Sequence, residues 1–443
     1  MSLPSRLGFA LPALLLLAAN PVLGQQQLGS KTEVEDAFVR VRNDFTRKYV
    51  TGEFEPKKEV LDLASQYYVY RVTWPNATSD SATMAGVIAE FKALVDPITN
   101  KDNLKRNQKF LDMFAPMLVS RFRQLTDLPF QENQKAVLNG VQMLPQLGRI
   151  KQDDVGKYLS DLIDDPSKHD AIKLYALKGI RENMPIQVLA DGDFIDNKLR
   201  KRRDLQAKQI DALERFITRQ PPSAMTEEEL RAFTYIRKEG IAALAHAGAP
   251  AVSALVKREG DVKGAVAPTL LRVLIPALRP DQEAPNNDMR LKPLPTIAEK
   301  VEAAIGVLNM HPEHLKLEGN YQPQVEAYAF GRFVKELGEA YNEDLPNLRI
   351  NVKDKDRRPP VLPWKLTAKR LEEAWVNAGS TKKGLPDDFK KLEAPVRDIL
   401  KQMYDFGNVA DRMVELAPLL RAPDQKLRVL FPGTKGAQAI ELD

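Results

Sequence analysis

Residues 238–252 read Lys-Glu-Gly-Ile-Ala-Ala-Leu-Ala-His-Ala-Gly-Ala-Pro-Ala-Val. A basic residue leads into a run of small and apolar residues, a glycine turn follows, and Pro-Ala-Val restarts the pattern. Three other segments follow a similar scheme and end on a proline: residues 135–145, 173–185 and 300–312. Because a helix pair cannot bury its apolar face alone, this pattern predicts short helices that stack on their neighbours.

The same helical spacing extends along most of the chain. Apolar residues recur at intervals of three, four and seven, as in Val34, Phe38, Val41 and Phe45. A threonine precedes a glutamate by three residues at Thr32, Thr226 and Thr296, which is the spacing of a capping box and predicts three helix N-termini. The only clean alternation, residues 348–352, is the one candidate strand. We therefore predict an all-α chain.

Composition excludes several classes of protein. The 443 residues include 65 Lys and Arg against 60 Asp and Glu, so the formal charge of +5 is too small to imply nucleic acid as a partner. The chain has no cysteine. This excludes disulfides, thiolate zinc sites, iron–sulfur clusters and cysteine nucleophiles. With 43% apolar residues, the chain is not mostly disordered.

The N-terminus has the pattern of a secretory signal. Arg6 supplies the positive region and residues 7–19 the apolar region, which is too short for a membrane span. A small-residue cleavage site follows, between Gly24 and Gln25. No later segment has 18 uninterrupted apolar residues, so we expect no stable membrane insertion after signal removal. The predicted location is the periplasm or the extracellular space.

The segment at residues 238–252 and its three relatives resemble HEAT-like helical repeats. Gly140 and Gly179 are 39 residues apart, which is similar to the period of that family. The resemblance covers about residues 130–315 and implies an irregular α-solenoid, or stacked helical hairpins. It also implies a scaffold that presents a surface to partners, and it implies no chemistry. An irregular helical domain with shared small residues is the alternative.

Two polar, Pro- or Gly-rich breaks divide the chain. We expect a signal peptide at 1–24, an N-terminal helical region at 25–190 and a HEAT-like region at 191–342, then a charged, Pro-rich linker at 343–363 and a C-terminal helical region at 364–443. We expect Trp364, at the end of the linker, to pack inward. The tyrosines 67, 68 and 70 at helical spacing are expected in the core.

Two segments have metal-ligating residue types. His311 and His314 enclose Pro312 and Glu313, but their spacing of three around a proline differs from the one-turn spacing of a helical zinc site, which favours a helix-terminal turn. Asp191 and Asp193 alternate as in a calcium loop. The loop pattern then fails, with Asp196 in place of glycine and Arg202 in place of the closing acid. Both sites are weak metal candidates, and we expect no cofactor.

One basic run could bind phosphates or other polyanions, and it comprises Lys198, Arg200, Lys201, Arg202 and Arg203. Acidic residues flank it on both sides, which weakens the field that a polyanion would feel. The pattern therefore favours an ordinary solvated helix face.

The function expected from the sequence is that of an exported, non-catalytic helical scaffold that binds another protein, whose identity and stoichiometry the sequence does not specify. Two alternatives stay open. One is an α-helical hydrolase or lyase that acts on an extracellular polymer through carboxylates converging in space. The other is a polyanion-binding module that uses the run from Lys198 to Arg203. We find no phosphate loop, nucleophile elbow, His-Glu-x-x-His or dinucleotide motif.

Overall fold

The computed structural model describes residues 26–99, 108–184, 196–221, 224–247, 266–274, 291, 293–309, 323–349, 360–381, 387–416, 427–430 and 439–442. In parts of these ranges, residues 196–204 among them, only the backbone is described. The predicted signal sequence and its cleavage site at Gly24 and Gln25 lie outside the described residues, as does the segment that contains Asp191 and Asp193.

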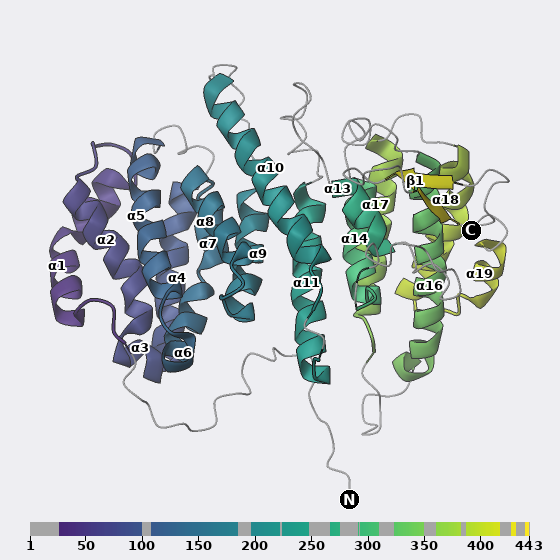
Figure 1. Ribbon diagram of the computed structural model, residues 1–443, viewed down its shortest axis with the longest axis horizontal. Coiled ribbons are helices and arrows are strands. Elements are labelled where there is room, and N and C mark those ends of the chain that lie inside the picture. Colours follow the sequence, from purple (N-terminus) through teal and green to yellow (C-terminus); the bar gives the residue numbers. More distant parts are fainter. Residues whose placement is uncertain are drawn as a thin grey trace, which may run out of the picture.

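The described residues are mainly helical, which confirms the predicted α-helical class. The helices are α1 (Lys31–Asp44), α2 (Lys58–Tyr70), α3 (Pro75–Ser79), α4 (Ser81–Ile98), α5 (Gln108–Thr126), α6 (Phe130–Val141), α7 (Leu144–Arg149), α8 (Asp153–Asp164), α9 (Asp170–Asn183), α10 (Asp196–Thr218), α11 (Glu227–Ala247), α13 (Val266–Leu274), α14 (Ile297–Asn309), α16 (Pro323–Arg349), α17 (Trp364–Thr381), α18 (Asp387–Tyr404) and α19 (Ala410–Leu416). Strands β1 (Leu427–Leu430) and β2 (Ala439–Leu442) form one antiparallel pair. Figure 1 shows the helices side by side along the longest axis, with α1 at one end and α19 at the other.

Helix ends follow local capping. Thr226 and Thr296 form the predicted capping boxes: their hydroxyls accept from the backbone N–H of Glu229 and Glu299, whose carboxylates accept in return. The prediction at Thr32 is wrong. Helix α1 starts at Lys31 and is capped by Ser30, two residues before the predicted cap, and the Ser30 hydroxyl lies 3.4 Å from the backbone nitrogen of Glu33.

Aromatic rings fill the core of the N-terminal helices. The predicted core tyrosines 67, 68 and 70 are at most 6% exposed. Phe38 of α1 stacks on Tyr67 of α2 with ring centroids 4.3 Å apart. The ring centroid of Phe45, the residue that follows α1, lies 5.7 Å from that of Phe114 of α5. These aromatic contacts join α1, α2 and α5 into one apolar layer.

Helices α8 and α10 run parallel. In the first half of each helix, Gly156 of α8 lets Leu205 of α10 approach so closely that a Cβ at Gly156 would be 2.8 Å from the leucine side chain. Toward their ends, Arg215 of α10 donates to Asp164 of α8 at 2.7 Å. The two contacts follow the same order along both helices, which fixes their common direction.

Helices α11 and α14 are also parallel. Arg237 of α11 donates to Glu299 near the start of α14, and further along, a Cβ at Gly306 of α14 would lie 2.5 Å from that of Ala245. Helix α10 runs antiparallel to α11. Phe216 packs against Gly240, while Arg219, the residue that follows α10, lies over Phe233, which is earlier in α11.

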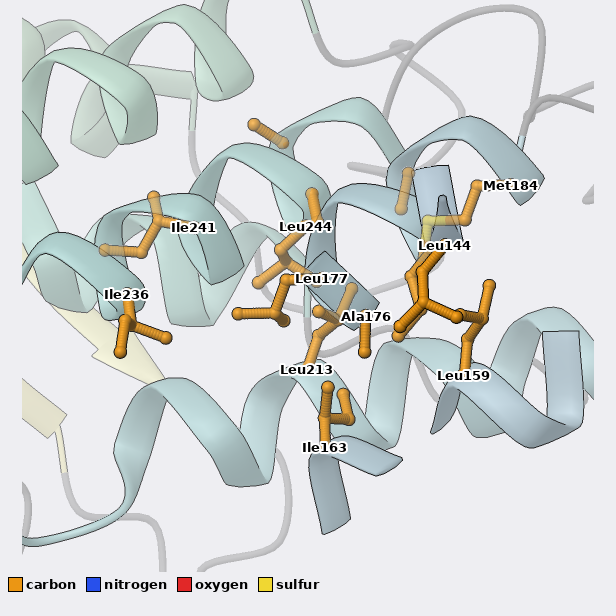
Figure 2. Close-up of a cluster of buried hydrophobic side chains, with 14 of the residues drawn as sticks. Leu144, Leu159, Ile163, Ala176, Leu177, Met184, Leu213, Ile236, Ile241 and Leu244 are labelled. Atoms are coloured by element: carbon orange, nitrogen blue, oxygen red, sulfur yellow. The ribbon is translucent and has the colours of Figure 1, made fainter. Parts of the chain in front are cut away.

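A single buried apolar cluster extends from Val34 in α1 to Leu416 in α19. Figure 2 shows one part of it, where side chains such as Leu177 of α9, Leu213 of α10 and Leu244 of α11 gather together. This shared core crosses the region boundary expected near Asp191. The helices before and after that boundary therefore pack as neighbours.

The expected linker at 343–363 begins inside a helix. Helix α16 continues through Pro346 to Arg349, so the strand candidate is wrong for residues 348 and 349. Trp364 packs inward as predicted: it is 2% exposed, and its indole N–H donates to Asp344 of α16 at 2.8 Å. No described helix has the length and apolar character needed to cross a bilayer.

Candidate functional site

The candidate residues from the sequence are placed only in part. His311, His314, Asp191 and Asp193 lie outside the described residues. The basic run from Lys198 to Arg203 lies on α10, as a helical segment, in the part where only the backbone is described. Within the described ranges, no three His, Asp or Glu side chains gather closely enough to hold a metal ion.

A different set of side chains forms an outward-facing surface over α9 and α11. We call it the α9–α11 face, and it consists of Tyr175, Lys178 and Arg181 on α9 and Tyr235, Lys238 and His246 on α11. Successive residues of the face are three or eight positions apart along each helix, and these spacings place side chains on one side of a helix. Their intervening neighbours, such as Leu177 and Ile236, point into the core.

The two helices bring these residues together because they run parallel. Burial is the main cause that raises the pKa of the Tyr235 phenol, and Glu239 and then Tyr175 raise it further. Tyr175, in the first half of α9, is therefore close to Tyr235, in the first half of α11. Near their ends, Arg181 is close enough to His246 to lower the pKa of its imidazole, although burial is the larger cause. The face therefore continues across both helices instead of ending at the groove between them.

The face carries the same cation–aromatic unit twice. The Lys178 ammonium lies 5.2 Å from the ring centroid of Tyr175, and the Lys238 ammonium lies 4.8 Å from that of Tyr235. Both lysines follow their tyrosine by three residues, one turn along the helix. The attraction between an ammonium and the face of an aromatic ring orients each lysine over its tyrosine.

Acidic groups neutralise this face only in part. Glu239 lies 3.8 Å from Lys238, which is a loose ion pair with 26% of the lysine side chain exposed. Among the described residues, no carboxylate lies within ion-pair distance of Lys178. Glu182 is close enough to raise the pKa of His246 against the effect of burial. Tyr235 is 42% exposed, so one ring of the face is open to solvent.

Buried contacts hold both helices rigidly beneath the face. On α9, Gly179 lies against Gly148 of α7, so closely that a Cβ at Gly148 would overlap the Gly179 carbonyl oxygen. On α11, the guanidinium of Arg237 donates to Glu299 of α14 at 2.5 and 3.1 Å, and both side chains are at most 1% exposed. Charge-assisted bidentate pairs of this kind fix the geometry of both partners.

The character of the surface changes beyond α11. Glu302 of α14 accepts two hydrogen bonds from Arg370 of α17, at 2.8 and 2.7 Å. This bidentate pair neutralises both charges, and Glu302 raises the pKa of the Arg370 guanidinium through the hydrogen bond. The Glu302–Arg370 pair therefore adds no net charge to the surface beyond α11.

Sequence reasoning did not identify the α9–α11 face. The signal was present as Tyr-x-x-Lys at residues 175–178 and again at 235–238. Tyrosines at helical spacing are also typical of a core, as Tyr67 and Tyr68 show. Only the packing of α9 against α11 brings the two motifs together. Comparison with known family models, curated proteins and solved structures finds no match.

Proposed function

We propose that this protein is an exported, non-catalytic α-helical scaffold that binds a protein partner through the α9–α11 face. The observation that carries the proposal is the repeated tyrosine–lysine unit on two rigidly held, parallel helices. Tyrosine and arginine, here the exposed Tyr235 and Arg181, are among the residue types that dominate protein interfaces. Export rests on the signal-like N-terminus, Arg6 with the apolar run 7–19.

We further propose that the helices form an irregular α-solenoid of the HEAT-like kind. The parallel pairs α8 with α10 and α11 with α14, and the antiparallel pair α10 with α11, support this arrangement. In a solenoid, each helical hairpin repeats the orientation of the one before it, and contacts join neighbours only. Helices α9, α11 and α14 would then form one layer, and α8, α10 and α13 the other.

Site-specific photocrosslinking in the native host tests the interaction. A photoreactive amino acid replaces Tyr235, or Val39 of α1 or Val414 of α19 as controls; these two side chains are 60% and 72% exposed. We expect a discrete crosslinked protein from position 235 and none from the controls. The same products at all three positions, or none at position 235, would contradict the proposed interface.

N-terminal sequencing of the exported chain tests the localisation separately. We expect the mature protein to begin at Gln25 and to be recovered from the periplasm or the culture medium. Recovery from the cytoplasm with Met1 intact would contradict export.

A further inference from the structure

We propose that the α9–α11 face binds an extended segment of the partner protein that presents carboxylates at every third residue. This inference rests on the proposed function and specifies the chemistry of the partner. Charge is the first observation that supports it. On the α9–α11 face, Lys178, Arg181 and Lys238 outnumber the neighbouring acids Glu182 and Glu239, and the looseness of the Lys238–Glu239 pair leaves that ammonium able to take a second carboxylate.

The spacing of the two units favours an extended ligand. Packed helices lie about 8–10 Å apart, so we expect equivalent positions on α9 and α11, such as those of Lys178 and Lys238, to be separated by about that distance. A polyproline II segment rises about 3.1 Å per residue with three residues per turn, so its every third side chain returns to the same side after about 9 Å. One carboxylate per turn would therefore meet one lysine per helix.

The tyrosines supply the apolar part of the surface. The Tyr235 ring is 42% exposed beside its lysine, and that of Tyr175 is half-buried. Aromatic rings of this kind pack against the pyrrolidine rings and peptide planes of an extended, proline-containing chain. The preformed polyproline II conformation also loses little entropy on binding.

The charge distribution disfavours a membrane or a nucleic acid as the ligand. Glu182 and Glu239 lie among the cations, and the Glu302–Arg370 pair neutralises the surface beyond α11. A polyanion needs a continuous positive field, whereas carboxylates at a fixed spacing need only two well-placed ammonium groups.

Fluorescence anisotropy with the full mature chain tests the inference directly. The probe is a labelled peptide of repeated Glu-Pro-Pro triplets. The comparison peptides are repeated Lys-Pro-Pro triplets and a peptide of the first composition with its glutamates in one block. We expect the Glu-Pro-Pro peptide to bind, the block peptide to bind several-fold more weakly, and the Lys-Pro-Pro peptide not to bind.

Variants then locate the binding. Two partly exposed ion pairs together account for a loss of about tenfold, so Lys178→Ala/Lys238→Ala should raise the Kd of the Glu-Pro-Pro peptide by about that factor. Lys178→Arg/Lys238→Arg should largely retain binding. Lys365→Ala is the matched control, because Lys365 of α17 lies over Phe406 at 4.6 Å in a lysine–aromatic pair that includes no residue of α9 or α11.

Several outcomes would overturn the inference. They are an unchanged Kd for the alanine double variant, an equal loss for Lys365→Ala, equal binding of the block peptide, and equally effective displacement by heparin, which would indicate a general polyanion site. Crosslinking at position 235 without any binding of the Glu-Pro-Pro peptide would refute the acidic segment and leave the scaffold standing. Absence of both would refute both.

Discussion

The close approach of α7 and α9 leads to a specific prediction about Gly148. A Cβ at this position would overlap the carbonyl oxygen of Gly179 and lie 2.9 and 3.0 Å from its carbonyl carbon and Cα. Ordinary carbon–carbon contacts are about 3.5–4.0 Å, and backbone atoms cannot rotate away as side chains do. Gly148→Ala therefore requires the two helices to separate, by about 1 Å.

The expected cost follows from three contributions. Overpacking costs about 1–3 kcal/mol. The separation also weakens the hydrogen bond from the Asn183 side chain to the Gly148 carbonyl, 3.2 Å long, which contributes about 1 kcal/mol. The higher helix propensity of alanine offsets up to about 1 kcal/mol. The free energy of unfolding should therefore fall by about 2 kcal/mol.

Two other glycines make the measurement a graded series. A Cβ at Gly179 would lie 2.9 Å from the Leu144 carbonyl oxygen, so Gly179→Ala should be less costly than Gly148→Ala. A Cβ at Gly86 of α4 would meet nothing within 4 Å, so Gly86→Ala should stabilise the protein by about 0.5–1 kcal/mol. Urea unfolding followed by circular dichroism gives all three values. A Gly148→Ala variant as stable as Gly86→Ala would refute the close crossing.

Three further predictions concern charge and capping. Arg237→Met leaves Glu299 buried without its partner and should cost about 3–5 kcal/mol in urea unfolding, whereas Arg237→Met/Glu299→Gln should recover part of that; equal costs would refute the pair. Burial lowers the pKa of His169, whose Nδ1 caps α9, so the folded state favours the neutral ring and the free energy of unfolding should fall as the pH drops below about 6.5. His169→Asn should flatten this dependence of stability on pH, and an unchanged slope in the variant would contradict the role of His169. Thr226→Ala should lose about 1 kcal/mol by thermal unfolding, and Thr32→Ala almost nothing; equal losses would contradict the assigned caps.

The helical class could be predicted because it depends on local spacing. The capping boxes at Thr226 and Thr296 are set by residues three positions apart, and the structure contains both. Thr32 has the same spacing, but Ser30 starts the helix first. Pro346 was expected in a linker, yet α16 continues through it, and Asp344 just before it holds the chain at Trp364. Such tertiary contacts override local signals.

The candidate site depended on contacts that no local pattern contains. Tyr175 and Tyr235 are distant in the sequence and meet only because α9 and α11 are parallel neighbours. The buried partners Arg237 and Glu299 were likewise separate in the sequence, although Glu299 was predicted within a capping box. Charged residues are rarely buried unless they are paired, and the pairing is visible only in three dimensions.

The buried guanidinium–carboxylate contact has a consequence for the alignment of α11 and α14. Apolar side chains recur at every turn, so a helix can shift along its neighbour by one turn, about 5.4 Å, and still pack against apolar side chains. The Arg237–Glu299 pair opposes such a shift, because each side chain would then be charged and buried without its ion-pair partner. The ion pair therefore fixes the axial register of the two helices, and with it the position of Glu302 of α14 relative to α11.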